Sequence, residues 1–156
     1  MERRARPLLR RLRLGAGAGV AGTVVMSGVM LAADRFGRLG LPPPQAISEQ
    51  TMQLASGARP AASTGRALGL VAHLGFGAAG GAAYALLPRV LGPDLRGLGW
   101  GLLVYAVSYQ GWVPAMGALP PATRDRRDRV AVMIFAHAVY GSVLGRAEQA
   151  LRQRSS

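Results

Sequence analysis

Two histidines, His73 and His137, are the side chains of this sequence best suited to chemistry. Imidazole titrates near neutral pH and can exchange a proton, form hydrogen bonds or bind a metal. Both residues begin the same pattern, His-x-x-aromatic-Gly-x-x-x-Gly, which covers 73–81 and again 137–145. The repeated pattern predicts that the two imidazoles lie at similar depth on two similar helices.

Three interpretations of this histidine pair are open. Each neutral imidazole could hydrogen-bond a neighbouring helix, with Tyr105, Ser108 and Gln110 as the candidate partners. The pair could instead handle protons or a solute. Two histidines from two helices, with glycines beneath them, could also bind a haem as its two axial ligands. We expect an intramembrane polar site made of His73, His137, Gln110 and Tyr105, with no obligatory cofactor.

The remaining residues offer little catalytic chemistry. The chain has no cysteine, which excludes disulfides, thiolate metal sites and cysteine nucleophiles. Its apolar stretches hold no nucleophile–base pair and no carboxylate pair, and two histidines without a carboxylate make a poor zinc site. We therefore expect no catalytic residue, no metal site and no enzymatic activity.

The histidines lie in stretches that carry no charge. Four stretches lack Asp, Glu and Arg, at 14–33, 67–87, 97–118 and 130–145, and all charged residues lie in the other half of the chain. A spanning helix needs about 20 apolar residues. A chain of 156 residues is too short to surround four such helices with water-facing protein. The sequence predicts an all-α membrane bundle of four transmembrane helices. The last stretch is short, and it would span either by local thinning of the bilayer or by extension through Arg146 and Ala147, with the Arg146 side chain reaching the interface.

The charge pattern predicts the organisation of the chain. The six arginines that precede the first stretch favour cytoplasmic N- and C-termini in a bacterial inner membrane. A cleaved signal peptide is an alternative for the first stretch, but its apolar core is longer than such peptides use. The predicted parts are a basic cytoplasmic arm at 1–13, a membrane domain at 14–151 with spans at about 14–33, 67–87, 97–118 and 130–147, an external loop at 34–66, and a cytoplasmic tail at 152–156.

Within the loop at 34–66, the Pro42-Pro43-Pro44 run predicts a stiff, polyproline-like segment, and 46–56 is compatible with one short helix. In the third stretch, Pro114 after Gly111 predicts a kink near the outer end of the helix. Gln110, beside this kink, is the candidate buried amide.

The net charge of +12 comes from 19 arginines and no lysine against 7 acidic residues. Clustered arginine can bind nucleic acid. Arginine that flanks spanning helices is ordinary membrane topology, and the arm at 1–13 would lie against anionic lipid headgroups. We expect the bilayer and its anionic headgroups as partners, and no nucleic acid.

Each uncharged stretch, with its flank, contains a GxxxG pair. Glycines at this spacing let helix backbones approach closely. They predict helix packing, including association with a second copy or with another membrane subunit. The pairs are Gly15/Gly19, Gly77/Gly81, Gly97/Gly101 and Gly141/Gly145.

A second repeated motif, Leu-Pro-Pro, follows the first and third stretches. It occurs as Leu41-Pro42-Pro43 and as Leu119-Pro120-Pro121, where it is expected to end the helices. With the repeated histidine pattern, it predicts two similar hairpins that point the same way in the membrane.

These motifs resemble the YagU-like family of largely uncharacterised bacterial inner-membrane proteins. The resemblance rests on the two Leu-Pro-Pro motifs and on the apolar run Phe135-Ala136-His137-Ala138-Val139-Tyr140-Gly141, and it covers about two-thirds of the chain. Family members tend to have Gly where this chain has Ala136. The resemblance implies an integral membrane protein and no established reaction. The hypotheses are a structural or accessory membrane protein that packs through its glycine faces, or a small transporter or proton-linked channel that uses His73 and His137.

Overall fold

The computed structural model describes residues 2–154, with side chains from residue 6 onward. The fold is all-α, as predicted, and no strand occurs within these residues. The helices form five rods, because α4, η1 and α5 follow one another without a break. The elements are α1 (Glu2–Arg35), α2 (Pro43–Ser56), α3 (Ala62–Tyr84), α4 (Pro93–Val107), the π-helix η1 (Ser108–Trp112), α5 (Val113–Ala115) and α6 (Arg127–Gln153).

Three helices are long and apolar enough to cross a membrane, namely Arg6–Arg35, Ala62–Tyr84 and Arg127–Gln153. They correspond to three of the four uncharged stretches and imply that the protein contacts a lipid bilayer. The remaining stretch, 97–118, is divided among α4, η1, α5 and the turn that follows.

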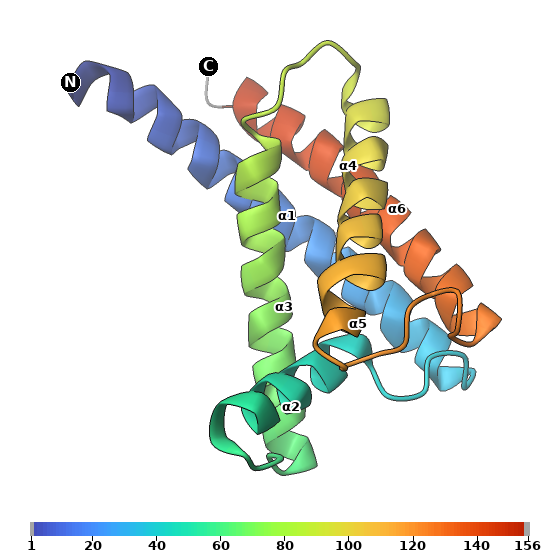
Figure 1. The fold of residues 1–156 in the computed structure, drawn as a ribbon. Helices are drawn as coiled ribbons and strands as arrows, with labels where there is room; N and C mark the ends of the chain where they lie inside the picture. Colours follow the sequence, from blue (N-terminus) through green and yellow to red (C-terminus); the bar gives the residue numbers. More distant parts are fainter. Residues whose placement is uncertain (1, 155–156) are drawn as a thin grey trace.

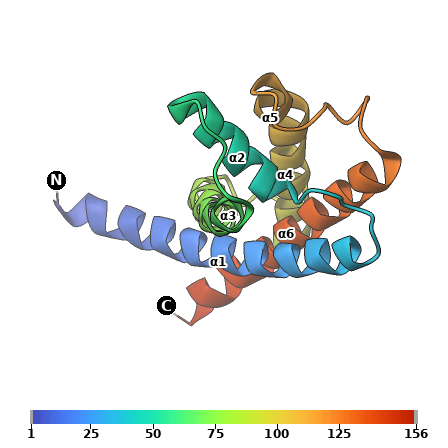
Figure 2. The same ribbon diagram turned by 90° about the horizontal axis from the view of Figure 1, so that it is seen from below.

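The helices run back and forth between two ends of the bundle (Figure 1). Both termini lie at one end, whereas α2, α5 and the start of α6 lie at the other. α1 packs along α3, α4 packs along α6, and α1 also packs along α6. Viewed from the α2 end, α3 is seen nearly end-on while α1 and α6 run across it (Figure 2). α3 and α4 make no comparable contact within the described chain.

The contact between α1 and α3 is made through glycines. A Cβ added at Gly15 would overlap the carbonyl oxygen of Gly81, and one at Gly19 would overlap that of Gly77. The hydroxyl of Thr23 donates to the Gly19 carbonyl oxygen at 2.9 Å and covers Gly77. The two backbones therefore touch over two successive turns.

The contact between α4 and α6 repeats this arrangement. A Cβ at Gly97 would overlap the carbonyl oxygen of Gly141, and one at Gly101 would overlap that of His137. Gly145 lies against the carbonyl group of Pro93. All four GxxxG pairs are thus placed inside the chain, so these faces are already covered. Association with a second copy or another subunit would need other surfaces.

α2 begins at Pro43, inside the proline run that the sequence predicted to be polyproline-like. The prediction of an extended run was wrong because proline fits the first turn of a helix, where no N–H is required. α2 lies across α3, with the Pro44 carbonyl oxygen 2.7 Å from where a Cβ on Gly69 would stand. The short helix expected over 46–56 is therefore present, and it is held against the bundle.

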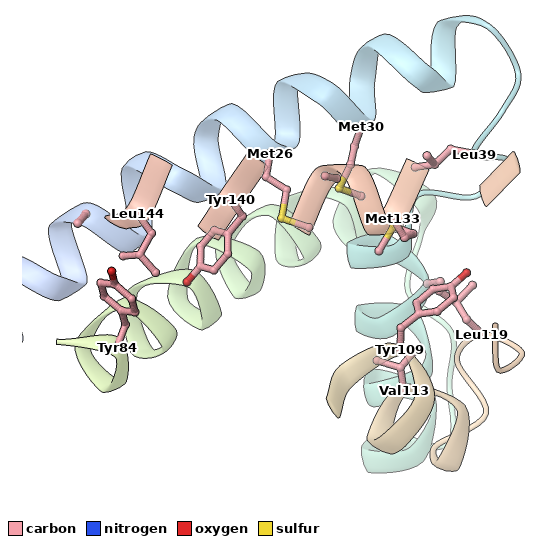
Figure 3. Close-up of a cluster of buried hydrophobic side chains, with 13 residues drawn as sticks. Met26, Met30, Leu39, Tyr84, Tyr109, Val113, Leu119, Met133, Tyr140 and Leu144 are labelled. Atoms are coloured by element: carbon pink, nitrogen blue, oxygen red, sulfur yellow. The ribbon is translucent and has the colours of Figure 1, made fainter. Parts of the chain in front are cut away.

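The buried side chains gather at two levels (Figure 3). Tyr84 and Leu144 lie towards the end that carries the termini, while a larger group lies near α2. This larger group contains three methionines on two helices, together with residues of η1, α5 and the loops: Met26, Met30, Met133, Tyr109, Val113, Leu39 and Leu119.

Candidate functional site

A cavity of about 170 Å³ lies in the half of the bundle that α2 covers. It is bounded by α1, α2, α3, η1 and α6, and both His73 and His137 line it. The two predicted histidines, which are far apart in sequence, therefore share one space. Most of the other side chains around it are apolar, including Met26, Met30, Phe76, Trp112 and Met133.

His137 is almost fully buried, with 6% of its surface exposed. Its Nδ1 lies 2.8 Å from the carbonyl oxygen of Met133, one turn earlier on α6. Because a carbonyl oxygen can only accept, Nδ1 carries the proton and Nε2 is left with its lone pair. The ring of Tyr105 meets the imidazole edge-on, with centroids 5.5 Å apart.

His73 is held in a similar way from the other helix pair. Its Nδ1 lies 3.3 Å from the hydroxyl of Ser27 on α1. No hydrogen bond joins the Nε2 atom of either histidine to any part of the chain that the structure describes. Both rings are thus oriented through their Nδ1 atoms.

Tyr105 and Gln110 have different positions relative to the histidines. Tyr105 contacts His137 and stacks on Tyr109, with ring centroids 5.5 Å apart. Gln110 is exposed, and its side-chain oxygen accepts a hydrogen bond from the Ala122 backbone at 3.2 Å. The expectation that Gln110 is buried was therefore wrong. The π-helical turn adds a residue to the helix and rotates Gln110 out of the bundle.

Several residues of the site were not predicted from the sequence. Ser27 positions His73, and Phe76 and Trp112 line the cavity as a tilted pair with centroids 6.0 Å apart. Phe76 is 48% exposed and Trp112 39% exposed, so this pair also borders the outside of the bundle. Met26 and Met30 are spaced by one helical turn, and this spacing is the sequence signal that could have indicated their common face.

A polar contact closes the α2 end of the bundle. The Tyr109 hydroxyl donates to the carboxylate of Asp125, whose side chain is nearly buried. Arg129 lies 3.4 Å from the same carboxylate and donates through Nε to the Leu39 carbonyl oxygen at 2.8 Å. These bonds tie η1, α6 and the loop before α2 together beside the cavity.

The profile of a family of unknown function, DUF6789, matches residues 9–156. The chain belongs to the DUF6789 family. The match includes both histidines, all four glycine pairs and α2. No curated protein and no solved structure matches the chain. The comparisons give no support to the resemblance to the YagU-like family, and the DUF6789 description assigns no activity.

The cavity of this DUF6789 chain does not fit a haem. Its volume of about 170 Å³ is close to that of an engineered protein cavity that holds a single benzene. A haem carries four pyrrole rings around its iron and is several times larger. The bis-histidine haem alternative is therefore not compatible with this packing. Within residues 6–154, no group of three or more His, Cys, Asp or Glu side chains is placed to hold a metal ion.

Proposed function

We propose that this DUF6789 chain is a four-span protein of the bacterial inner membrane that binds a small membrane-soluble ligand between His73 and His137. The observation that carries this proposal is the shared cavity. It is lined by two oriented imidazoles from different helix pairs, and their Nε2 atoms form no hydrogen bond within the described residues. Polar side chains inside a membrane protein are costly to keep, and they mark functional sites by default.

The continuous rod formed by α4, η1 and α5 supports the four-span topology. α4, η1 and α5 run without interruption from Pro93 to Ala115, and their only charged residues are Asp94 and Arg96 in the first turn. Both termini lie at the same end of the bundle, as an even number of crossings requires (Figure 1). The arginine-rich arm favours the cytoplasm for that end.

Two similar hairpins, α1/α3 and α4/α6, account for the paired histidines. The same sequence distance separates Gly19 from Gly97, Ser27 from Tyr105 and Leu41 from Leu119. Ser27 contacts His73 in the first hairpin, and Tyr105 contacts His137 in the second. We therefore propose that the two hairpins are repeats and that the cavity forms where their equivalent histidine faces meet.

The chemistry of the cavity defines the class of ligand. Its size suits one six-membered ring or a similarly compact group. Its lining is mainly apolar, and an imidazole Nε2 that lacks a proton accepts a hydrogen bond. A fitting ligand is therefore apolar, compact and equipped with at least one O–H or N–H donor.

The position of Phe76 and Trp112 indicates how such a ligand enters. Both side chains line the cavity and are partly exposed on the outside of the bundle. They lie on α3 and η1, where the two hairpins do not pack tightly. In a membrane this side faces lipid, so the ligand would enter sideways from the bilayer.

Binding is favoured over catalysis and over a purely accessory role. The cavity lining contains no carboxylate among the described residues, and the Ser27 hydroxyl that contacts His73 does not itself line the cavity. The glycine faces, through which an accessory role was expected, are occupied within the chain.

A proton-linked transporter is a second candidate, which one set of contacts favours. Asp125 bonds Tyr109, Tyr109 stacks on Tyr105, and Tyr105 contacts His137. This series leads from the loop before α6 to the cavity. A pH-dependent flux in liposomes that His73→Leu and His137→Leu each abolish would favour this candidate.

Two matched probes test the binding proposal. Phenol and toluene have the same ring and nearly the same size, but only phenol has an O–H donor. In protein labelled with ¹⁵N-histidine, only two imidazoles contribute signals. We expect phenol to shift the Nε2 signals strongly and toluene to shift them little.

The histidine variants provide the control. Phenol should lose its advantage over toluene in the His73→Leu/His137→Leu double variant, which keeps an apolar cavity. Because this variant has no histidine signal, equilibrium dialysis measures the binding of both probes to the wild-type protein and to the variant. If phenol leaves both imidazole signals unchanged in the folded wild-type protein, the proposal is wrong.

A further inference from the structure

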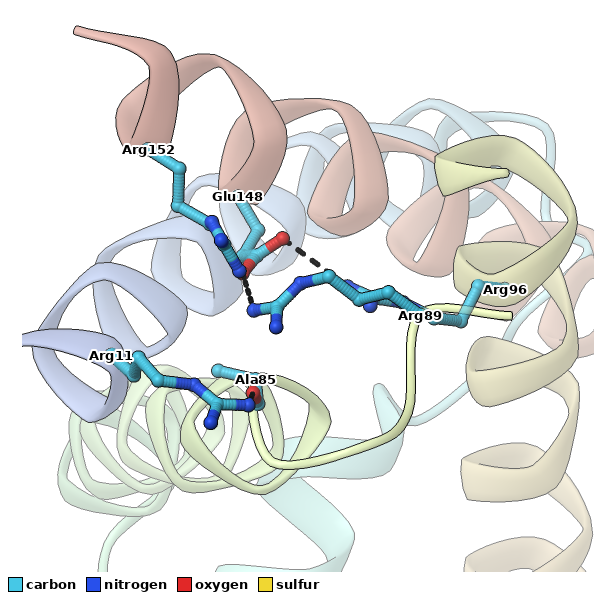
Figure 4. A network of polar contacts seen from close by, with 6 residues as sticks. All are labelled: Arg11, Ala85, Arg89, Arg96, Glu148 and Arg152. Atoms are coloured by element: carbon cyan, nitrogen blue, oxygen red, sulfur yellow. Dashed lines mark hydrogen bonds and ion pairs between the residues drawn. The ribbon is translucent and has the colours of Figure 1, made fainter. Parts of the chain in front are cut away.

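At the end of the bundle opposite α2, we infer a second site, which binds the phosphate group of an anionic lipid or free phosphate through Arg89, Arg96 and Arg152. Glu148 of α6 lies at its centre, and Figure 4 shows the three guanidinium groups converging on this carboxylate. The site is separate from the histidine cavity, and the inference does not rest on the function proposed for that cavity.

Glu148 is saturated by arginine contacts. Arg89 Nη2 donates to Oε1 at 2.8 Å, and Arg96 Nη2 donates to Oε2 at 3.2 Å. Arg152 Nη1 lies 3.5 Å from Oε1, one helical turn away. Only 3% of the Glu148 surface is exposed. Arg89 and Arg96 therefore share one buried carboxylate as their counter-ion, which leaves a positive excess between them.

Arg96 is the buried member of this group of arginines. Its side chain is 8% exposed and packs over the ring of Tyr84, with Cζ 4.2 Å from the ring centroid. Its Nε is buried without a hydrogen-bond partner in the described structure. A buried guanidinium with an unused donor and an already shared counter-ion is costly, and a further anion would lower that cost.

The arginines surround a hollow large enough for such an anion. It has a volume of about 330 Å³ and is lined by Arg89, Arg96, Glu148 and Arg152, together with Gln149 and Gln153. Arg89 and Arg152 are partly exposed at its mouth, with 33% and 39% of their side-chain surfaces accessible, so they can turn towards a ligand. Pro93, at the positive N-terminus of α4, also lines it.

Phosphate is the anion that best matches this set of donors. Guanidinium groups bind phosphate oxygens in pairs, with fixed geometry and strong charge-assisted hydrogen bonds. The residues that line the hollow follow α3, begin α4 and end α6. Because α3 and α6 are candidate spans, their ends would lie close to the level of lipid headgroups in a membrane. Basic pockets between helices at this level are typical binding sites for anionic lipids.

The experiment measures thermal unfolding of the full chain in detergent, followed by tryptophan fluorescence. Phosphatidylglycerol, phosphatidylcholine and sodium phosphate are titrated separately at constant ionic strength. We expect phosphatidylglycerol to raise the unfolding temperature at lower concentration than phosphatidylcholine. Arg89→Gln should raise the half-maximal concentration about tenfold, because one charge-assisted phosphate contact is lost.

Arg146→Gln is the matched control. Arg146 also lies on α6, and it pairs with Asp94 at 2.6 Å, but it is exposed and does not line the hollow. It should leave the half-maximal concentration nearly unchanged. Glu148→Gln should lower the unfolding temperature in the absence of anion. It should also increase the protection by phosphatidylglycerol, whereas Arg89→Gln weakens it, because the carboxylate that competes for the arginines is gone.

The outcomes separate the two sources of phosphate. Protection by phosphatidylglycerol but not by sodium phosphate indicates a lipid headgroup, and protection by both indicates that the phosphate group alone is bound. The inference is overturned if phosphatidylglycerol and phosphatidylcholine protect equally and phosphate does not protect. It is also overturned if Arg89→Gln and Arg146→Gln weaken protection to the same extent, because this would indicate general charge attraction.

Discussion

Gly97 on α4 lies directly against Gly141 on α6, so close that a Cβ on Gly97 would overlap the Gly141 carbonyl oxygen and stand 3.2 Å from the Cα of Gly145. No flexible side chain lies between the two backbones. The α4/α6 contact therefore cannot absorb an added methyl group without moving a helix.

We expect Gly97→Ala to destabilise the protein by about 1–3 kcal/mol, the usual cost of overpacking. Gly99 is the control on the same helix, because a Cβ there would meet nothing within 4 Å. Gly99→Ala should be neutral or slightly stabilising. Unfolding in mixed detergent micelles, followed by circular dichroism, measures both. Equal stabilities for the two variants would contradict this close contact.

The aromatic pair at the side of the cavity predicts a change in exchange rate. Removing the ring in Phe76→Ala or Trp112→Ala should widen the opening between α3 and η1. We expect faster exchange of bound phenol, measured by the line widths of the histidine signals.

Phe135→Ala is the control for this opening. Phe135 is a ring on α6 that is 60% exposed and does not line the cavity. Its removal should leave exchange unchanged. If all three variants exchange alike, the ligand enters by another route.

The bond between Tyr109 and Asp125 predicts a stability difference between two neighbouring tyrosines. Tyr109→Phe removes a donor from a nearly buried carboxylate and should cost about 1.5–3 kcal/mol. The Tyr105 hydroxyl has no hydrogen-bond partner in the described structure, so Tyr105→Phe should change stability by less than about 0.5 kcal/mol. Chemical denaturation in micelles measures the two. A cost for Tyr105→Phe as large as that for Tyr109→Phe would refute this assignment.

The proposed topology predicts the labelling of introduced cysteines. The chain has no cysteine of its own, so each single variant reports one position. Ser56→Cys, at the exposed end of α2, should react with a membrane-impermeant maleimide in intact cells. Gln153→Cys, at the end of α6, should react only after the membrane is opened. Labelling of both positions in intact cells would exclude four spans.

The absence of charge was sufficient to locate the long helices but not their ends. It located α1, α3 and α6 because charged side chains are excluded from hydrocarbon. α6 nevertheless continues to Gln153, because charged residues such as Glu148 and Arg152 favour a helix outside the apolar stretch as well. The glycine spacing likewise predicted close helix packing. It could not show whether the partner helix belongs to the same chain or to another one, because the same spacing occurs in both kinds of contact. Only the fold shows that Gly97 meets Gly141.

The candidate site was predictable in part. His73 and His137 were recognisable because imidazoles are rare in apolar stretches and these two share a pattern. Gln110 was misplaced because a π-helical turn changes which residues face inward, and helical periodicity cannot reveal that turn. The cluster around Glu148 was not predicted, because arginines that flank a membrane helix are common and a single acidic residue among them is not distinctive. Only the fold shows that Arg89 and Arg96 contact Glu148.

The sideways opening beside Phe76 and Trp112 has a consequence for how the cavity would be supplied. A compound that reaches it through the acyl chains is governed by its mole fraction in the lipid, and its aqueous concentration matters only through the partition coefficient. An apolar compound is enriched in the lipid phase, so even a weak intrinsic affinity would suffice for high occupancy of the cavity. Adding empty vesicles would dilute the compound and lower the occupancy without any change in the protein.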